Sequence, residues 1–130
     1  MIFAVLLILI ITYVFLIFSS DINTKNERFL KKFGIIINPA PVSFEEIRIP
    51  ESFDAVYQSY NFLQIEAGFD LSDYKGLDAV RYTYEILNFP DEKKVYANVI
   101  CRDNKAIGGD IACIEADGYM LPLNFLLTNQ

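Results

Sequence analysis

Residues 1–18, MIFAVLLILIITYVFLIF, carry no charged side chain, and Thr12 is the one clearly polar residue among them. As an α-helix this run would rise about 1.5 Å per residue and span roughly 27 Å, close to the ~30 Å thickness of the hydrocarbon core of a bilayer. The run therefore predicts an uncleaved transmembrane anchor over residues 1–20, in which Met1–Phe18 contacts the lipid bilayer.

Two other interpretations of this run fit less well. A signal peptide has a basic start, a shorter apolar run and small residues before the cut. Here nothing basic precedes the run, and Phe18 is unsuitable three positions before a cut after Ser20. No Cys follows that could carry a lipid. A buried helix is also disfavoured, because a domain of this size rarely encloses eighteen apolar residues on all sides.

The charges that flank the run bear on its orientation. Four basic residues follow it and only the terminal amine precedes it, so the positive-inside rule places the folded part in the cytoplasm. If the true start codon lies further upstream, a few additional Lys or Arg residues before the run would reverse this orientation. The residues alone leave both orientations open. The four basic residues are Lys25, Arg28, Lys31 and Lys32.

The remaining residues, 21–130, fit one small domain. They hold all 17 Asp and Glu and all 11 Lys and Arg residues, so their net charge is −6, and we expect no nucleic-acid partner for an acidic domain without a basic stripe. The chain has no His, which excludes Ser-His and Cys-His nucleophilic sites and His-bearing zinc sites. We expect a protein that is not an enzyme, with no catalytic residue and no cofactor.

Asp70 and Asp73 lie close in sequence, with Glu66 nearby, and their oxygens could in principle bind a calcium ion. Their spacing lacks the alternating ligands and the central Gly of an EF-hand loop. We therefore expect no metal site, with Asp70 capping the loop and Asp73 exposed to solvent.

Two helices are predicted after the anchor. A juxtamembrane helix over residues 21–34 would be capped by Asn23 or Thr24 and stopped by Gly34. A longer helix would open at Pro50-Glu51, with Ser52 as the cap, and close at Gly68. Its apolar residues recur at three- and four-residue steps, which predicts one stripe packed against a sheet. These residues are Phe53, Val56, Tyr57, Tyr60, Leu63 and Ala67.

Alternating apolar residues predict the strands. A weak edge strand covers residues 42–49, and two runs follow that pair Ile86 with Val95 and Tyr84 with Ala97. A third run, residues 106–115, places Ile107, Ile111 and Cys113 on the same inner face. The predicted fold is α+β: an antiparallel meander of three to four strands packed against two helices on one side, in a domain of residues 35–130. Cys101 and Cys113 would lie too far apart for a disulfide.

Seven short motifs carry a resemblance to a known family. In order and at similar spacing they resemble the bacterial family called domain of unknown function 4830, seen mostly in clostridia-like bacteria. The resemblance implies a membrane-anchored or secreted protein without known activity, and an extracytoplasmic domain, because members often begin with a basic leader or a lipoprotein signal. Members tend to carry His-Gly where this chain has Leu121-Pro122, so no role for that His is carried over. The motifs are Gly68-Phe69-Asp70-Leu71, Tyr74-Lys75-Gly76, Tyr82-Thr83-Tyr84-Glu85, Asn88-Phe89-Pro90, Ala97-Asn98, Ile107-Gly108-Gly109-Asp110 and Gly118-Tyr119-Met120.

Two features are candidates for an interaction surface. The Gly108-Gly109-Asp110 trio places two glycines in a strand, which indicates either close approach by a ligand or another chain, or a bulge or an aromatic side chain covering the bare backbone. Among the tyrosines, Tyr74, Tyr96 and Tyr119 are the best candidates for the surface. A half-buried tyrosine can contact a partner protein or stack on a sugar.

The anchor and the absence of a catalytic set favour a non-enzymatic binding or regulatory module of the bacterial cell envelope. Its partner would be an envelope protein or a wall ligand, bound at the glycine surface or by strand addition at an exposed sheet edge. One alternative is a carboxylate-based hydrolase acting on cell-wall glycan, which needs two acids about 5–9.5 Å apart in a cleft. Another is a cytoplasmic membrane-tethered adaptor, which the basic residues after the anchor favour.

Overall fold

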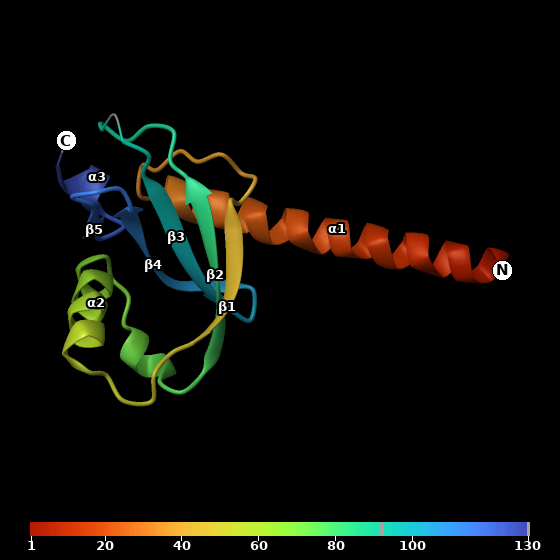
Figure 1. Cartoon of the computed structure of the whole chain (residues 1–130), viewed down its shortest axis with the longest axis horizontal. Coiled ribbons are helices and arrows are strands. Elements are labelled where there is room, and N and C mark those ends of the chain that lie inside the picture. The colour runs from red at the N-terminus through yellow and green to blue at the C-terminus, as the bar shows by residue number, and fades with distance from the viewer. Residues whose placement is uncertain (92, 130) are drawn as a thin grey trace.

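A computed structural model of the chain describes residues 1–91 and 93–129, without the side chains of residues 18–20. The described part is α+β, as the sequence predicts, with a five-stranded antiparallel sheet and one helix that projects far from it (Figure 1). In chain order the elements are α1 (Ile2–Lys31), β1 (Ser43–Arg48), α2 (Ala55–Glu66), the 3-10 helix η1 (Leu71–Tyr74), β2 (Asp78–Glu85), β3 (Tyr96–Arg102), β4 (Lys105–Cys113), β5 (Tyr119–Leu121) and α3 (Phe125–Thr128).

The sheet is a meander in which the strands lie in chain order, β1-β2-β3-β4-β5. β1 is at one edge, as predicted, and the short β5 adds a strand beyond the three or four expected. The central hairpin has the predicted register: Tyr84 faces Ala97, and the Ile86 N–H donates to the Val95 carbonyl at 2.9 Å. The sequence predicted this register correctly because the alternating apolar residues of both strands must lie on the same buried face.

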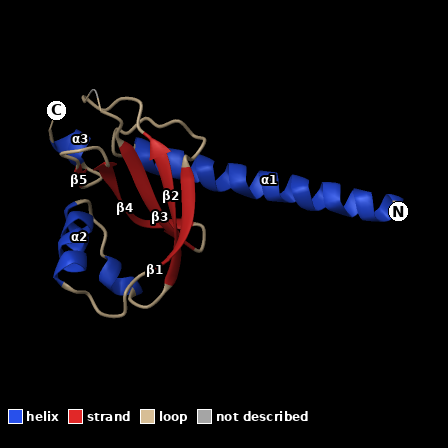
Figure 2. Ribbon diagram, viewed as in Figure 1, coloured by secondary structure: helices blue, strands red, loops and turns tan. Residues whose placement is uncertain are grey.

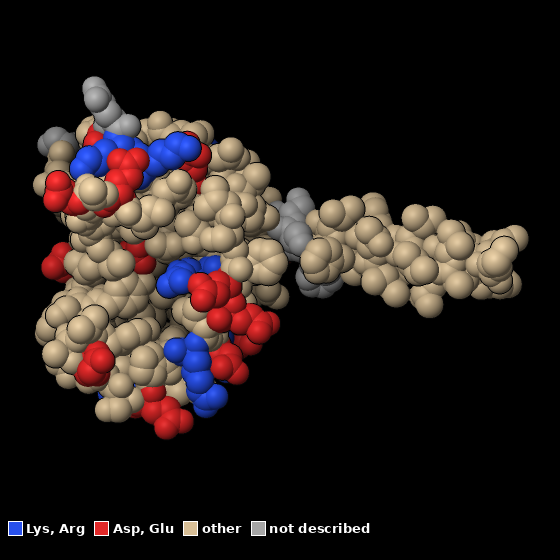
Figure 3. Space-filling model, viewed as in Figure 1, with Lys and Arg blue, Asp and Glu red and all other residues tan. Residues whose placement is uncertain are grey.

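α1 is one continuous helix of 30 residues, whereas the sequence predicted a new helix beginning at Asn23 or Thr24. No Gly or Pro lies between residues 19 and 31, so nothing in the chain forces a break. The N-terminal half is long and apolar enough to cross a membrane, and none of that apolar stretch is buried within the protein. Figure 3 shows that this projecting half carries no charge, whereas charges of both signs cover the folded part.

The C-terminal half of α1 packs on one face of the sheet. Leu30 and Ile22 are buried there among residues of β2, β3 and β4, including Val99 and Ile111. α1 ends at Lys31, and the chain reverses at Gly34, whose φ of +74° is the left-handed conformation that glycine adopts most easily. The predicted stop at Gly34 is therefore confirmed.

Helices cover both faces of the sheet, so the prediction that they lie on one side is wrong (Figure 2). The second face carries Ala79 and Ile100, which pack with Leu71 of η1 and with Tyr57 and Tyr60 of α2. Val99 and Ile100 are both buried although they are neighbours in one strand, which requires an apolar layer on each face.

A β-bulge supplies part of that second layer. Cys101 faces Ala106 and Ile100 faces Gly108, so Ile107 is an extra residue between the two pairs. It turns to the second face and packs in the cluster of Ile100 and Leu71. The expectation that Ile107 shares a face with Ile111 and Cys113 is therefore wrong, because an alternating pattern does not reveal an inserted residue.

α2 begins later than the sequence predicted, at Ala55. Its N-cap is Asp54 and not Ser52: the Asp54 carboxylate accepts from the Tyr57 N–H at 2.8 Å. Asn61 and Gln64 are its buried residues, whereas Val56 of the predicted apolar stripe is exposed. The face of α2 that meets the sheet therefore carries buried polar groups beside the rings of Tyr57 and Tyr60. Within the described residues, Gln64 Nε2 is buried without a hydrogen-bond partner, an exception to the usual pairing of buried polar atoms.

A buried polar cluster fixes α1 to the sheet. Asn26 Nδ2 donates to the Tyr84 hydroxyl at 2.9 Å, and that hydroxyl donates to Asn23 Oδ1 at 2.7 Å. The Cys101 thiol donates to Asn26 Oδ1 at 3.3 Å, and burial raises the pKa of this thiol to about 11. Cys101 and Cys113 are both free and buried.

We predict that Tyr84→Phe destabilises the protein by about 1–3 kcal/mol, because it removes the hydrogen-bond partner of the buried Asn26 amide and of the half-buried Asn23 amide. The measurement is urea unfolding of the full chain in detergent micelles, followed by circular dichroism. Tyr96→Phe also removes a phenolic hydroxyl, but from a half-buried tyrosine outside this cluster, and it serves as the control. Equal unfolding free energies for the two variants would contradict a structural role for the cluster.

Candidate functional site

Half of the second sheet face is open. α2 and η1 cover the half where β2 begins and β3 ends. The other half forms a groove of about 400 Å³, and Figure 3 shows this face hollowed beside the part that the helices cover. The groove is lined by Val42, Ser43, Arg81, Thr83, Tyr96, Asn98, Ala112, Ile114 and Met120.

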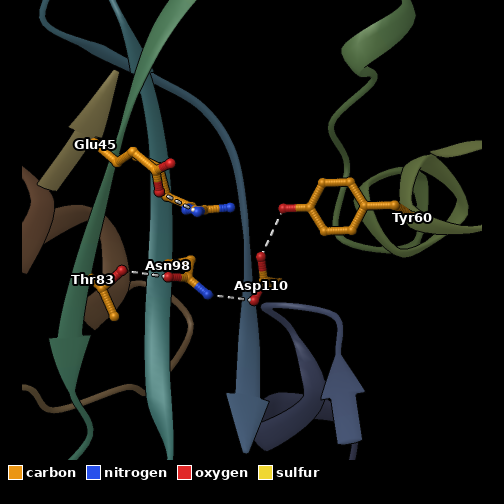
Figure 4. Close-up of polar contacts among 6 residues, drawn as sticks. Glu45, Tyr60, Thr83, Asn98 and Asp110 are labelled. Atoms are coloured by element: carbon orange, nitrogen blue, oxygen red, sulfur yellow. Dashed lines mark hydrogen bonds and ion pairs between the residues drawn. The ribbon is translucent and has the colours of Figure 1, made fainter. Parts of the chain in front are cut away.

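On the floor of the groove, Thr83 and Asn98 belong to a line of hydrogen-bonded side chains that crosses three strands and ends beneath α2 (Figure 4). The Thr83 hydroxyl donates to Asn98 Oδ1 at 2.7 Å, and Asn98 Nδ2 donates to Asp110 Oδ1 at 2.8 Å. From the opposite side, the Tyr60 hydroxyl of α2 donates to Asp110 Oδ2 at 2.7 Å. The line follows from register, because Thr83 faces Asn98 and Asn98 faces Asp110 across the ladder.

Asp110 is the buried end of this line and is 1% exposed. Burial raises the pKa of its carboxyl group, while the hydrogen bonds from Asn98 and Tyr60 and the charge of Arg81 act in the opposite direction. Arg81 forms its ion pair with Glu45 of β1, at 2.6 Å, at the β1 side of the groove. Burial and the neighbouring Asp110 also raise the pKa of Tyr60.

The two glycines before Asp110 are buried beneath α2. The Gly109 N–H donates to Gln64 Oε1 at 2.8 Å, and a Cβ at Gly108 would lie 2.6 Å from that oxygen. A Cβ at Gly109 would collide with the backbone carbonyl of Asn98. Close approach therefore explains the glycine pair, but the approaching groups, Gln64 at Gly108 and the Asn98 carbonyl at Gly109, belong to the same chain. Gly108, Gly109 and Asp110 are not exposed surface in this arrangement, which corrects the expectation that they form one.

The three candidate tyrosines do not share a surface. Tyr96 is half-buried and lines the groove. Tyr74 packs beside Ile49 and Leu71 under the covered half of the same face. Tyr119 packs on the α1 face, where its hydroxyl donates to Asp91 Oδ2 at 2.6 Å, and burial together with Asp91 raises its pKa to about 12.

Sequence reasoning missed most of the groove. Arg81, Thr83 and Asn98 occupy the polar positions between the apolar residues of β2 and β3, and such positions are ordinarily assigned to solvent. The predicted hairpin register already placed Thr83 beside Asn98. Adding β4 in the same register would have identified the line to Asp110.

Among the acidic residues considered for calcium, Asp70 has a structural role, whereas Asp73 and Glu66 are exposed. Asp70 caps η1 by accepting from the Ser72 N–H at 2.9 Å, and it also accepts from Asn61 Nδ2 at 2.9 Å. The bond to the Ser72 N–H confirms the predicted capping role. The hydrogen bond from Asn61 has the largest effect on the pKa of Asp70, and together with the bonds from Ser72 it lowers that pKa. Within residues 1–91 and 93–129, no three His, Cys, Asp or Glu side chains are grouped so that they could hold a metal ion.

We predict that Asp110 makes the protein less stable as pH rises. Because burial raises its folded-state pKa above the ordinary value of 3.8, the folded state binds this proton more tightly than the unfolded state. The stabilising contribution is complete below that ordinary value and is lost as pH rises through the folded-state pKa. The unfolding free energy of the wild type relative to Asp110→Asn should therefore fall with pH.

Urea unfolding of the full chain in micelles at a series of pH values measures this difference. Asp73→Asn changes an exposed carboxylate and should leave the pH dependence as in the wild type. If the difference between the wild type and Asp110→Asn rises with pH, Asp110 is stabilised as an anion by Tyr60, Asn98 and Arg81, and the account of its pKa is wrong.

Comparison with known proteins gives one match. A family model described as Domain of unknown function (DUF4830) matches residues 29–111, from the last residues of α1 into β4. No curated protein and no solved structure matches the chain. The matched region includes the polar line and the floor of the groove, and it excludes the apolar half of α1.

Proposed function

Because the chain belongs to the family Domain of unknown function (DUF4830), whose description assigns no activity, we propose a function from the structure. The protein is a single-pass membrane protein whose folded part is a non-enzymatic binding or regulatory module of the bacterial cell envelope. The observation that carries this proposal is the groove on the open half of the sheet, which has a preorganised polar floor and lies on a domain continuous with an apolar helix.

The rim of the groove favours a protein as the partner. Val42, Ile114 and Met120 are exposed apolar side chains around a polar floor, and Ile114 is 79% exposed. Apolar patches with a polar surround are typical of protein interfaces, and methionine adapts to irregular apolar surfaces. A sugar site would instead present an open aromatic face, whereas Tyr96 is half-buried. We therefore assign the groove to a segment of another envelope protein.

The site does not favour the glycan-hydrolase alternative. Asp110 has the raised pKa expected of an acid catalyst, but it is 1% exposed and already bound by Tyr60 and Asn98. Glu45 is exposed and is held in its ion pair with Arg81. A glycosidic oxygen could reach Asp110 only if α2 moved away, so a binding role requires fewer changes to this arrangement.

We propose that the folded part lies outside the cell. The support is the resemblance to family members that begin with a basic leader or a lipoprotein signal. The basic residues after the apolar run, such as Lys25 and Arg28, favour the opposite orientation and a cytoplasmic adaptor. One experiment can test the orientation and the groove together.

The experiment uses single cysteines at Tyr96 or Met120, with Cys101 and Cys113 replaced by Ala. Intact cells are labelled with a membrane-impermeant maleimide that carries a photoreactive group, and they are then irradiated. We expect labelling without lysis, followed by a discrete cross-linked protein from both groove positions, because both residues line the groove. Val56→Cys, on an exposed part of α2, is the matched control and should give no such product.

Labelling only after lysis would show that the folded part is cytoplasmic and would favour the tethered adaptor. The same products from position 56 as from positions 96 and 120, or products from none of them, would show that the groove is not the binding surface.

A further inference from the structure

β1 is the strand nearest the projecting half of α1, and β5 lies at the far side of the sheet (Figure 1). Because β1 is an edge strand, one side of its backbone has no strand partner within the described part of the chain. Of the two edges of the sheet, the one formed by β1 is therefore the edge that faces the proposed membrane.

The folded part begins very close to the end of the apolar run. That run ends at residue 18, and Ile22 is already buried in the core. Four residues of helix correspond to about 6 Å along the axis. The polar headgroup layer of one leaflet is roughly 5–7 Å thick, so the core begins within or directly against that layer.

Phe44 is the exposed aromatic residue on this strand. It faces Tyr82, which faces Val99, so Phe44 lies on the sheet face that α1 covers. Its ring stacks on Tyr82 with a centroid distance of 6.3 Å and is nevertheless 68% exposed. An exposed apolar ring on the sheet face that α1 covers is suited to the boundary between headgroups and acyl chains, where Phe, Trp and Leu of interfacial segments bury.

We infer that Phe44 and the free edge of β1 rest in the lipid headgroup layer of the membrane that α1 crosses. This inference rests on the proposed membrane anchor, but not on the groove or its partner. The lipid contact would give the domain a second attachment point and would restrict its rotation about α1. It would also shield an edge strand that could otherwise pair with another chain.

The chain contains no Trp, so a substituted Trp is a reporter without background. The full chain is reconstituted in phosphatidylcholine vesicles, with and without bromine on the acyl chains near the headgroup. Three variants are compared: Phe44→Trp at the proposed contact, Phe15→Trp within the apolar run, and Phe62→Trp on α2. Phe62 is 62% exposed, close to the 68% of Phe44, which makes it a matched control.

We expect strong quenching of Phe15→Trp, clear quenching and a blue-shifted emission for Phe44→Trp, and several-fold weaker quenching for Phe62→Trp. If Trp at position 15 is quenched while Trp at positions 44 and 62 is not, the membrane anchor is supported and the lipid contact of Phe44 is overturned. A blue shift at position 44 without quenching would mean that protein covers Phe44, which also overturns it. No quenching at position 15 would overturn the anchor itself.

Discussion

The continuity of α1 is the constraint on which the rest of the structure depends. The same helix is wholly exposed and apolar in its first half and part of the folded core in its second. Its attachment combines apolar burial at Leu30 with the hydrogen bonds that join Asn23 and Asn26 to Tyr84. Buried amides and hydroxyls are costly to leave unpaired, so these hydrogen bonds fix the rotation of α1 about its own axis. A purely apolar contact would fix that rotation less strictly.

The second face of the sheet follows a different principle. There α2 meets the sheet through the rings of Tyr57 and Tyr60 and also through hydrogen bonds: Gln64 accepts from the backbone N–H of Gly109, and Tyr60 donates to Asp110. Such a contact needs glycines for close approach and leaves the remaining half of the face uncovered. The groove is thus a consequence of how short α2 is and where it binds, and its floor is ordered by the same hydrogen bonds that position the helix.

Sequence patterns predicted the parts of this fold that depend on local periodicity. The pairing of Tyr84 with Ala97 and the stop at Gly34 were correct, because alternation and glycine conformation are local properties. The predicted apolar stripe of α2 was right at Tyr57 and Tyr60, which pack against the sheet. It did not include Asn61 and Gln64, because these residues are buried through partners 10 and 45 residues away. The groove was missed for the same reason: its polar floor is defined by the alignment of three strands.

The central claim is that the anchor and the folded part form one rigid body. The direct test is a distance measurement by pulsed electron paramagnetic resonance on the full chain in lipid nanodiscs, with spin labels at Ile10→Cys and Leu87→Cys and the native cysteines replaced by Ala. Both positions are exposed, and they lie on the two halves of the molecule. A chain with a Gly-Ser-Gly insertion after Asp21 provides the reference for a flexible joint. The account predicts one narrow distance distribution that broadens on insertion; a distribution as broad as that of the reference would contradict it.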